Sequence, residues 1–404
     1  MNRNQIFTTL EFIDDIIRMC IGEYYNEKFY IFDTFKCHCS GLESSNIVDV
    51  EDVRKTITEL VELIKEKTEI IVEEVILCMP SNHLIINDFA STFPVTGKNY
   101  LINQYDINES YKVASKIRHR DDEIVINIAP LEYQLDDNQK MDMPPLRYKS
   151  TTFKTLYKVY MLPVNVYNSY LNIVSYCNLK VNKFYLDVDC LYCGIFEEDD
   201  ISASILNIDK SSTSLLLYKK GKLQNKITIP FGTILIEKEV CEKLAIKDKN
   251  ELNNLIYNVG SSISSKNTYL SVCKNAEGKY VSEYDINYII EESMKNIINK
   301  IFAKVNLKSQ ELDICISGYG ANIKNIDVLL NKLYGCNASY YVSSSLGLYN
   351  PGYCQTIGLI RLNYKKISQN KYINIENKSY NDIIINKEVN SKFDRFILDE
   401  DELD

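Results

Sequence analysis

A strand–turn–strand pattern occurs twice in this chain of 404 residues, at its start and again near its midpoint. Residues 6–23, continuing through 28–32, are rich in apolar side chains, which predicts two buried strands joined by a turn. Residues 203–208 and 213–218 repeat that pattern around the turn Asp209-Lys210-Ser211-Ser212, and 226–229 supply a third strand. A chain of this length is too long for one hydrophobic core of ordinary size. We therefore expect an α/β protein of two lobes, each opened by such a hairpin.

Segments with the periodicity of helices and strands connect the two hairpins. Apolar residues recur every three or four positions over 52–67, which predicts an amphipathic helix, and a buried strand is expected at 75–79. Strand, strand, helix and strand in this order indicate a mixed α/β lobe. Further strands are expected at 84–89, 124–129, 157–162 and 183–186, and helices at 109–117, 164–178 and 188–196.

After the second hairpin the chain continues mainly as helices. Helices are expected at 233–244, 250–257, 285–305 and 323–333, and a strand at 313–317 runs into Gly318-Tyr319-Gly320. These elements suggest the domain boundaries. We expect a first lobe core at 1–79 and 164–200, an inserted subdomain at 80–163, a second lobe core at 201–232 and 313–366, a smaller subdomain at 233–312 and a flexible acidic tail at 367–404.

Composition and charge exclude several classes of protein. Hydrophobic residues make up 45% and charged residues 25% of the chain, as is typical of a globular protein. The net charge of -9 argues against a nucleic-acid partner, because phosphate-binding surfaces need an excess of Lys and Arg. No apolar run approaches the roughly 18–20 residues that cross a bilayer, and the N-terminus lacks the apolar core of a signal peptide. We expect a cytoplasmic protein.

The 12 cysteines are scattered along the chain and are interpreted as buried small side chains rather than as disulfides. Cys190-Leu-Tyr-Cys193 has the spacing of a metal or redox pair, but it lies in an apolar stretch without a second pair, which favours helix packing. Cys37-His38-Cys39 alternates like a strand, so its two Cys side chains should face away from His38. No metal site is expected.

Residues Ile126-Asn-Ile-Ala-Pro-Leu-Glu-Tyr-Gln-Leu-Asp136 are similar to the Ile-Pro-x-Glu-Tyr-x-Ile-Asp signature in the inserted subdomain of FtsA, a bacterial cell-division protein of the actin and Hsp70 superfamily. Shorter segments follow the order and approximate spacing of the same family. They are Asn178–Val181, Ile205–Tyr218, Ile229–Gly232, Gly260–Ser262, Ser317–Ala321 and Thr356–Leu359. The resemblance covers about residues 6–364 and indicates a divergent member, whose lack of Trp and many Tyr, Asn, Ile and Lys are typical of an AT-rich genome.

This resemblance implies an actin-like, ribonuclease H-like fold of two lobes, with the FtsA-type inserted subdomain at 80–163. In such proteins the two hairpin turns clamp the phosphates of ATP with magnesium, and a Gly turn of the second lobe meets the nucleoside. The positions that match this cofactor site are Glu11, Asn207, Lys210, Ser211, Ser212, Thr213, Glu251, Gly318, Tyr319 and Gly320. No catalytic residue is assigned.

Both turns depart from the family pattern at positions that carry the chemistry. A phosphate turn needs glycine, because its backbone must approach the phosphate oxygens closely. The family pattern of acid, apolar, Gly, Thr or Ser, and Ser aligns with Glu11-Phe12-Ile13-Asp14-Asp15, so Ile13 replaces the glycine. The two aspartates would oppose a triphosphate by about 4 kcal/mol for each close pair of like charges. In the second turn, Asn207 and Ser214 replace the magnesium-side acid and the terminal acid.

Two interpretations of these loops stay open. They are either tight turns without a ligand or a weak, metal-free nucleotide site. In the second case, only Glu11, Lys210 and the hydroxyl groups of the second turn would serve a phosphate. Tyr319, between two glycines, would either stack on a base or block it.

The function that the resemblance implies is a scaffold of the bacterial division ring on the inner face of the cell membrane. It would hold the C-terminal tail of FtsZ at 233–312 and assemble with itself into filaments. The family's C-terminal helix is basic, whereas residues 392–404 have two basic and six acidic side chains. Anionic lipid would repel this tail, so membrane association is expected to be indirect or through a partner. The tail is either a short motif for a protein partner or a solvated end.

Two enzyme hypotheses stand beside the scaffold. A slow actin-like ATPase with nucleotide-gated filament assembly requires ATP binding despite Ile13 and Asn207. A sugar or small-molecule kinase requires a carboxylate base in the cleft and glycines in its phosphate turns. This chain lacks those glycines. The leading hypothesis is the scaffold with weakened or lost ATP binding, and no cofactor is assigned beyond the ATP with magnesium that the family implies.

Overall fold

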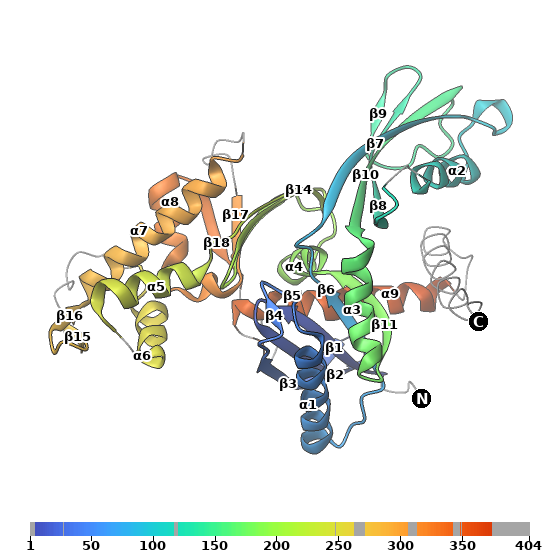
Figure 1. Ribbon diagram of the computed structural model, residues 1–404. Helices are drawn as coiled ribbons and strands as arrows, with labels where there is room; N and C mark the ends of the chain where they lie inside the picture. Colours follow the sequence, from blue (N-terminus) through green and yellow to red (C-terminus); the bar gives the residue numbers. More distant parts are fainter. Residues whose placement is uncertain are drawn as a thin grey trace. The chain divides into compact units, whose positions relative to one another are not determined.

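The computed structural model describes residues 5–373 except 27, 117–119, 247, 262–270, 306–312, 342–347 and 349. The chain divides into two compact units, each of which is described by itself (Figure 1). The first contains the residues up to 82 together with 169–364, and the second is built on 83–168. The acidic segment 392–404 lies outside the described residues. No helix in the described ranges is both long and apolar enough to cross a lipid bilayer.

The first sheet of the first unit has five strands in the order β11-β6-β1-β2-β3. The opening segment is a meander of three antiparallel strands rather than the expected hairpin of two, because the polar pair Asp14-Asp15 turns the chain within the apolar run. Parallel strands β6 and β11 extend the sheet on the β1 side. The strands are β1 (Gln5–Ile13), β2 (Ile16–Tyr25), β3 (Lys28–His38), β6 (Glu74–Met79) and β11 (Lys180–Leu186).

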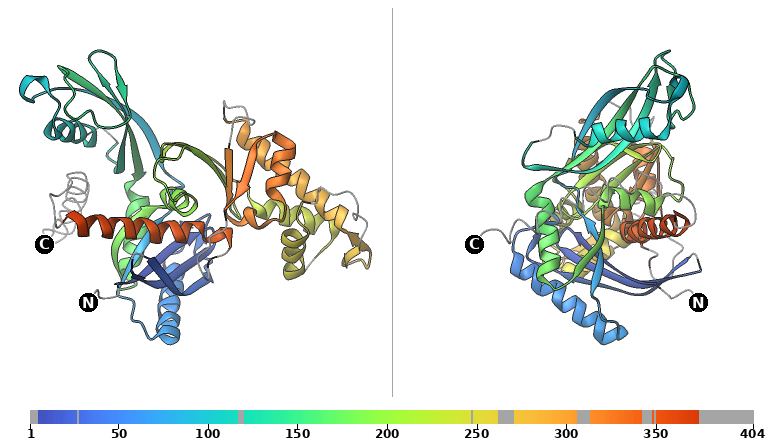
Figure 2. Two further views of the ribbon diagram at one scale, coloured as in Figure 1. Left: turned by 180° about the vertical axis from the view of Figure 1, so that it is seen from behind. Right: turned by 90° about the vertical axis from the view of Figure 1, so that its right-hand side faces the viewer.

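Helices pack on this sheet. Helix α1 (Val50–Thr68) begins after Asp49, whose carboxylate accepts hydrogen bonds from the backbone N–H groups of Glu51 and Asp52. Its buried stripe includes Val53, Ile57, Leu60 and Ile64, so the predicted amphipathic helix is confirmed. Helix α9 (Cys354–Ile373) runs across the sheet (Figure 2), and the Tyr24 hydroxyl donates to the Ile360 carbonyl at 3.0 Å. The remaining elements of this lobe are β4 (Leu42–Glu43), β5 (Asn46–Ile47), α3 (Val164–Tyr176) and α4 (Asp187–Ile195).

Helices α4 and α9 touch through two glycines. A Cβ atom on Gly194 would lie 1.8 Å from the Cys354 carbonyl oxygen, and one on Gly358 would lie 1.7 Å from the Cys190 carbonyl oxygen. Real side chains do not approach backbone this closely, so both positions require glycine. This close contact packs α4, the last helix of the first lobe, against α9, the last helix of the unit.

The second sheet of the unit repeats the topology of the first. Its order is β14-β13-β12-β17-β18, with an antiparallel meander β12-β13-β14 and two strands parallel to β12. The two lobes therefore share one strand plan, as the repeated hairpin pattern suggested. The strands are β12 (Ala203–Ile208), β13 (Thr213–Lys219), β14 (Lys222–Ile229), β17 (Asp313–Ser317) and β18 (Asn337–Tyr340).

A group of helices packs against this second sheet and shares one apolar core with it. Helix α7 (Glu283–Phe302) starts with a capping box, in which Ser282 and Asp285 bond each other's backbone N–H groups. Its buried isoleucines match the predicted long helix at 285–305. The other elements are α5 (Thr233–Leu244), α6 (Lys249–Asn254) followed by a π turn (Leu255–Val259), α8 (Ile326–Tyr334), and a hairpin of β15 (Ser271–Lys274) and β16 (Tyr280–Ser282).

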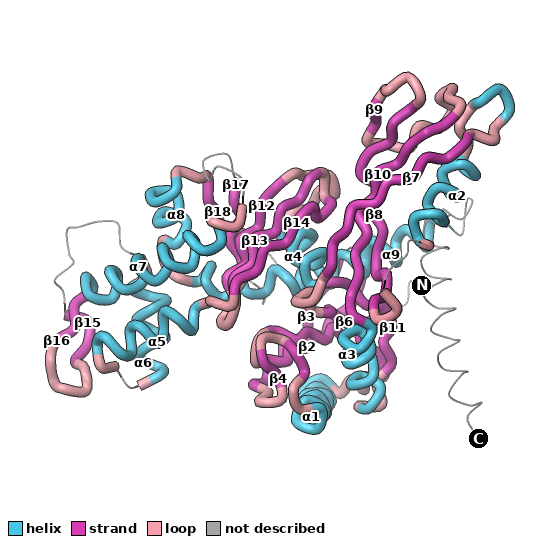
Figure 3. Tube along the Cα trace, turned by 45° about the horizontal axis from the view of Figure 1, so that its top comes forward, coloured by secondary structure: helices cyan, strands magenta, loops and turns pink. Residues whose placement is uncertain are grey.

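The second unit is an antiparallel sheet in the order β7-β10-β8-β9 with one helix against it (Figure 3). Strand β8 (Glu123–Leu135) extends past the expected end at 129, because a bulge opposite Leu156 and Tyr157 accommodates Pro130. The segment that resembles the FtsA signature lies on this strand. The other elements are β7 (Ile85–Pro94), α2 (Gln104–Ser115), β9 (Lys140–Met141) and β10 (Thr152–Pro163).

The cysteines are all free. Cys190 and Cys193 are buried on α4, which confirms that their spacing reflects helix packing. His38 is exposed at the end of β3, and its Nε2 lies 3.3 Å from Asp15 Oδ2. Within the described residues, no three His, Cys, Asp or Glu side chains are grouped as a metal site requires.

Candidate functional site

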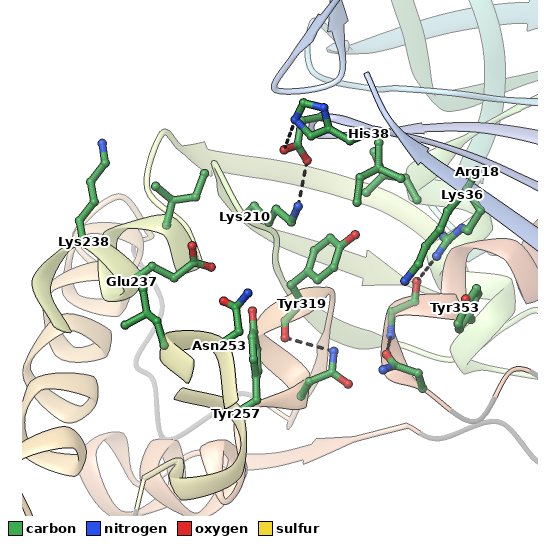
Figure 4. Close-up of a pocket in the computed structure, with 18 of the residues that line it drawn as sticks. Arg18, Lys36, His38, Lys210, Glu237, Lys238, Asn253, Tyr257, Tyr319 and Tyr353 are labelled. Carbon is green, nitrogen blue, oxygen red and sulfur yellow. Dashed lines mark hydrogen bonds and ion pairs between the residues drawn. The ribbon is translucent and has the colours of Figure 1, made fainter. Parts of the chain in front are cut away.

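A pocket of about 860 Å³ lies in the first unit, lined by side chains from both of its lobes (Figure 4). Its charged walls carry an excess of basic groups over Asp15 and Glu237. The basic lining residues are Arg18, Lys36, His38, Lys210 and Lys238, and the aromatic ones are Tyr257, Tyr319 and Tyr353. A pocket of this size and lining suits an anionic ligand with a ring system.

The turn between β1 and β2 forms one wall of the site. Asp14 has a φ of 52°, in the left-handed region that aspartate tolerates better than most residues. Its backbone N–H donates to the Ser45 hydroxyl at 2.8 Å, and its carbonyl accepts from the Ser45 N–H at 2.8 Å. The neighbouring Asp15 carbonyl accepts from the Cys39 N–H. These contacts fix the direction in which the Asp14 side chain points.

The turn between β12 and β13 forms the opposite wall. It is closed by a hydrogen bond from the Asp209 N–H to the Ser212 carbonyl at 2.9 Å. The carbonyls of Asp209 and Lys210 accept from the first N–H groups of α5, from Thr233 and Ile234 at 3.0 Å each. Gly232 permits this packing, because a Cβ there would lie 2.2 Å from the Asp209 carbonyl oxygen.

The two turns meet through the carboxylate of Asp14. One of its oxygens accepts from the Lys210 backbone N–H at 2.7 Å, and the other accepts from the Ser211 N–H at 3.4 Å and from the Ser211 hydroxyl. The Lys210 ammonium group donates to Asp15 at 3.0 Å, as the dashed line in Figure 4 marks. Lys210 and Ser211, two of the residues that the sequence assigned to a phosphate, are therefore bound by aspartates of the first turn.

A second carboxyl lies beside this contact. Burial raises the pKa of Asp209 well above its usual value, and the nearby Asp14 and Asp187 raise it further. Burial also raises the pKa of Asp14, although its bonds to Ser211 and Lys210 act in the opposite direction. The Asp209 carboxyl accepts from the Asn207 amide at 2.5 Å, and its burial beside Asp14 and Asp187 favours its neutral form. A buried carboxyl with a raised pKa, next to the amide Asn207, is a poor donor set for magnesium.

Glu11 does not line the pocket. Its side chain is fully buried on β1, where both carboxylate oxygens pair with the Arg18 guanidinium of β2 at 3.0 and 3.3 Å. Arg18 also donates to the Gly352 carbonyl at 2.9 Å and stacks over the Tyr353 ring. Arg18 was not assigned to the site from the sequence. An arginine directly opposite an acid in paired apolar strands is the signal that would have found it.

Comparison with protein-family models gives no match. Among curated proteins, the cell division protein FtsA of Streptococcus pneumoniae is 21% identical over 369 residues, which covers 89% of this chain and 80% of that protein. FtsA of Bacillus subtilis is 17% identical over 377 residues, which covers 89% of this chain and 84% of that protein. The similarity is low in identity and extends along most of both chains.

Solved structures share the arrangement of the elements. A chain of a PilM–PilN type IV pilus biogenesis complex matches 89% of this chain and 98% of its own length, with 12% identity and a TM-score of 0.58. MreB5 of Spiroplasma citri bound to ADP matches 93% of this chain and 99% of its own length, with 12% identity and a TM-score of 0.51. The chain has the actin-like fold.

The actin-like framework brings only part of the predicted site together. Lys210 and Tyr319 line the pocket, with the ammonium group 5.3 Å from the ring centre, whereas Ser211 does not line it and is bonded to Asp14. Ser212 takes part only through its backbone carbonyl, and the buried Thr213 hydroxyl donates to the Phe231 carbonyl at 2.7 Å.

The nucleoside side of the actin-like site also differs from the prediction. Glu251 is exposed on α6 and does not line the pocket, whereas Leu252 and Asn253 do. Gly318 has a φ of 79° and lies against Asn207 and Ile208, and Gly320 packs on the Ile208 side chain. The two glycines therefore serve close packing of the turn on β12.

Proposed function

We propose that the chain is a cell-division scaffold of the FtsA type that binds the C-terminal tail of FtsZ and assembles with copies of itself. The observation that carries this proposal is the similarity to FtsA proteins from several bacteria along 89% of the chain. The actin-like fold agrees with it. The scaffold would act at the division site on the inner face of the membrane, reached through a partner because residues 392–404 are acidic.

The contacts in the cleft support a scaffold that works without nucleotide. Asp14 already occupies the backbone N–H groups of Lys210 and Ser211, and Asn207 replaces an acid that magnesium would need. A triphosphate would have to displace a carboxylate and then lie beside two of them. The proposed role therefore depends on surfaces for partners rather than on ATP chemistry.

For the FtsZ tail we propose the aromatic face of the smaller subdomain. Tyr280, Tyr284 and Tyr288 are 71%, 49% and 56% exposed, and they follow one another at four-residue spacing from β16 into α7. The rings of Tyr284 and Tyr288 are stacked with their centres 6.3 Å apart. Tyrosine offers a short peptide both apolar area and a hydrogen-bonding hydroxyl, which is why it is common at binding hot spots.

Replacing Tyr284 and Tyr288 together by serine is expected to weaken binding of the organism's own FtsZ tail peptide by about ten-fold or more. Fluorescence anisotropy with a labelled peptide measures this. The matched control is Tyr30→Ser on β3, a tyrosine that is 47% exposed and lies in the other lobe, which should leave affinity unchanged. If the unaltered protein has no affinity for the peptide, the proposed function is wrong.

A slow actin-like ATPase is the second candidate, favoured by the basic and aromatic lining of the pocket. The two candidates make opposite predictions for a thermal-shift experiment at millimolar ATP with magnesium. We expect no shift, because a ligand stabilises the folded state appreciably only when its concentration reaches or exceeds Kd. A clear, concentration-dependent rise in Tm would favour the ATPase.

A further inference from the structure

The turn Asp209–Ser212 places several hydrogen-bond donors close together. Consecutive backbone N–H groups that point to one place form a concave anion site, and a side-chain hydroxyl strengthens it. Here the N–H groups of Lys210 and Ser211 and the Ser211 hydroxyl all donate to one carboxylate, that of Asp14. Hydrogen bonds to an ionised acceptor are stronger than neutral ones.

We propose that Asp14 is a permanent intramolecular ligand of this turn: its carboxylate fills the anion site, excludes phosphate from it and ties the two lobes of the first unit together. This inference deepens the proposed nucleotide-independent function and rests on it. The Asp14 side chain would thus account for the loss of phosphate binding, and it would also join the two turns that a phosphate otherwise bridges.

Contacts outside the turn Asp209–Ser212 orient the Asp14 side chain. Asp14 is only 5% exposed, and its N–H and carbonyl are both bonded to Ser45 in the loop before α1. An ion pair between Lys210 and Asp15 lies beside this contact. A buried carboxylate that accepts from three donors stabilises the fold more than an exposed ion pair does. In an exposed pair, the loss of side-chain conformational freedom offsets most of the electrostatic attraction.

A tethered carboxylate has an advantage over a free anion in competing for this turn. Groups attached to one framework meet at effective concentrations in the millimolar range or above, without the entropy cost of capturing a second molecule. A free phosphate would also lie beside Asp15, and one close like charge weakens binding roughly 1000-fold at intermediate dielectric. Free phosphate is therefore expected to be excluded at cellular concentrations.

The same geometry indicates what removing the carboxylate should do. Glycine and asparagine both tolerate the left-handed φ of Asp14, so Asp14→Gly and Asp14→Asn keep the turn conformation. Asp14→Gly empties the anion site, whereas Asp14→Asn keeps one weaker, neutral acceptor. Asp15→Asn is the matched control, because it removes a neighbouring negative charge and leaves the contacts of Asp14 in place.

Two measurements on the full chain test the proposal. In hydrogen exchange followed by mass spectrometry, the peptide covering Lys210 and Ser211 should exchange about ten-fold faster or more in Asp14→Gly than in the unaltered protein and in Asp15→Asn. In calorimetric titration with inorganic pyrophosphate, only Asp14→Gly should bind at millimolar concentration, and binding should slow the exchange again.

Unchanged exchange in Asp14→Gly, or pyrophosphate binding by the unaltered protein, would overturn the proposal. Should Asp14→Gly fail to fold, Asp14→Asn decides alone: faster exchange than in the unaltered protein and in Asp15→Asn is expected, and unchanged exchange contradicts the proposal. Neither measurement involves FtsZ. A chain that gains pyrophosphate binding on loss of Asp14 but ignores the FtsZ peptide would therefore refute the proposed partner and leave the intramolecular ligand standing.

Discussion

Replacing Arg18 by methionine is expected to lower the free energy of unfolding by about 3–5 kcal/mol, as loss of one partner of a buried ion pair typically does. Arg18 pairs with Glu11, whose side chain is inaccessible to solvent, and also donates to the Gly352 carbonyl. Methionine fills similar space but leaves the Glu11 carboxylate buried without its cation. Urea denaturation followed by circular dichroism measures the change.

Two further variants show whether the buried charge causes this loss. Exchanging Glu11→Gln and Arg18→Met together should restore part of the stability, because no uncompensated charge is left. Arg54→Met is the surface control, since the exposed pair of Arg54 and Glu51 should be worth about 0–1 kcal/mol. A loss below about 1 kcal/mol in Arg18→Met would show that the charge of Glu11 is compensated by other groups.

Gly358→Ala is expected to prevent α4 and α9 from reaching their observed contact and to destabilise the chain by roughly 3 kcal/mol or more, beyond the usual cost of overpacking. The added methyl group would lie 1.7 Å from the Cys190 carbonyl oxygen and 2.7 Å from the Gly194 nitrogen. These are backbone atoms in helices, so relief requires movement of a whole element. Differential scanning calorimetry should show a large fall in Tm or an insoluble protein.

The control for this prediction lies on the same helix. Gln355→Ala shortens a half-buried polar side chain of α9 and introduces no close contact, so its Tm should change little. If Gly358→Ala melts within a degree or two of Gln355→Ala, the helices are able to separate at the crossing without loss of packing. The contact would then contribute little to the stability of the first unit.

The periodic elements were predictable from sequence because each carries its signal locally. The apolar alternation of 203–208 and 213–218 and the stripe of 52–67 predicted β12, β13 and α1 close to their observed bounds. Strand β18 was missed, since it has four residues and only Ala338 is buried. Helix α9 was also missed as a helix, because its apolar residues follow no clear stripe and the short match at 356–359 was all that marked it.

The site was less predictable because its contacts join distant parts of the chain. The sequence showed that Asp14 and Asp15 would repel a phosphate, but not that the Asp14 carboxylate binds a turn 196 residues further on. Glu11 was assigned to a ligand, whereas the structure places it in an ion pair with the neighbouring strand. The type of residue at an aligned position indicates which interactions its side chain is able to make. The residues that the fold places next to it determine which of these interactions forms.

A contact between the lobes that is made by the chain's own side chains, rather than by a nucleotide, does not change with time. A bound triphosphate changes when it is hydrolysed, so an assembly that depends on one can distinguish old subunits from new. The contact of Asp14 with Lys210 and Ser211 has no such second form. Subunits whose lobes are joined by this contact do not differ between newly added and older copies. The turnover of any assembly they form would therefore depend on the concentrations of the protein and of its partners.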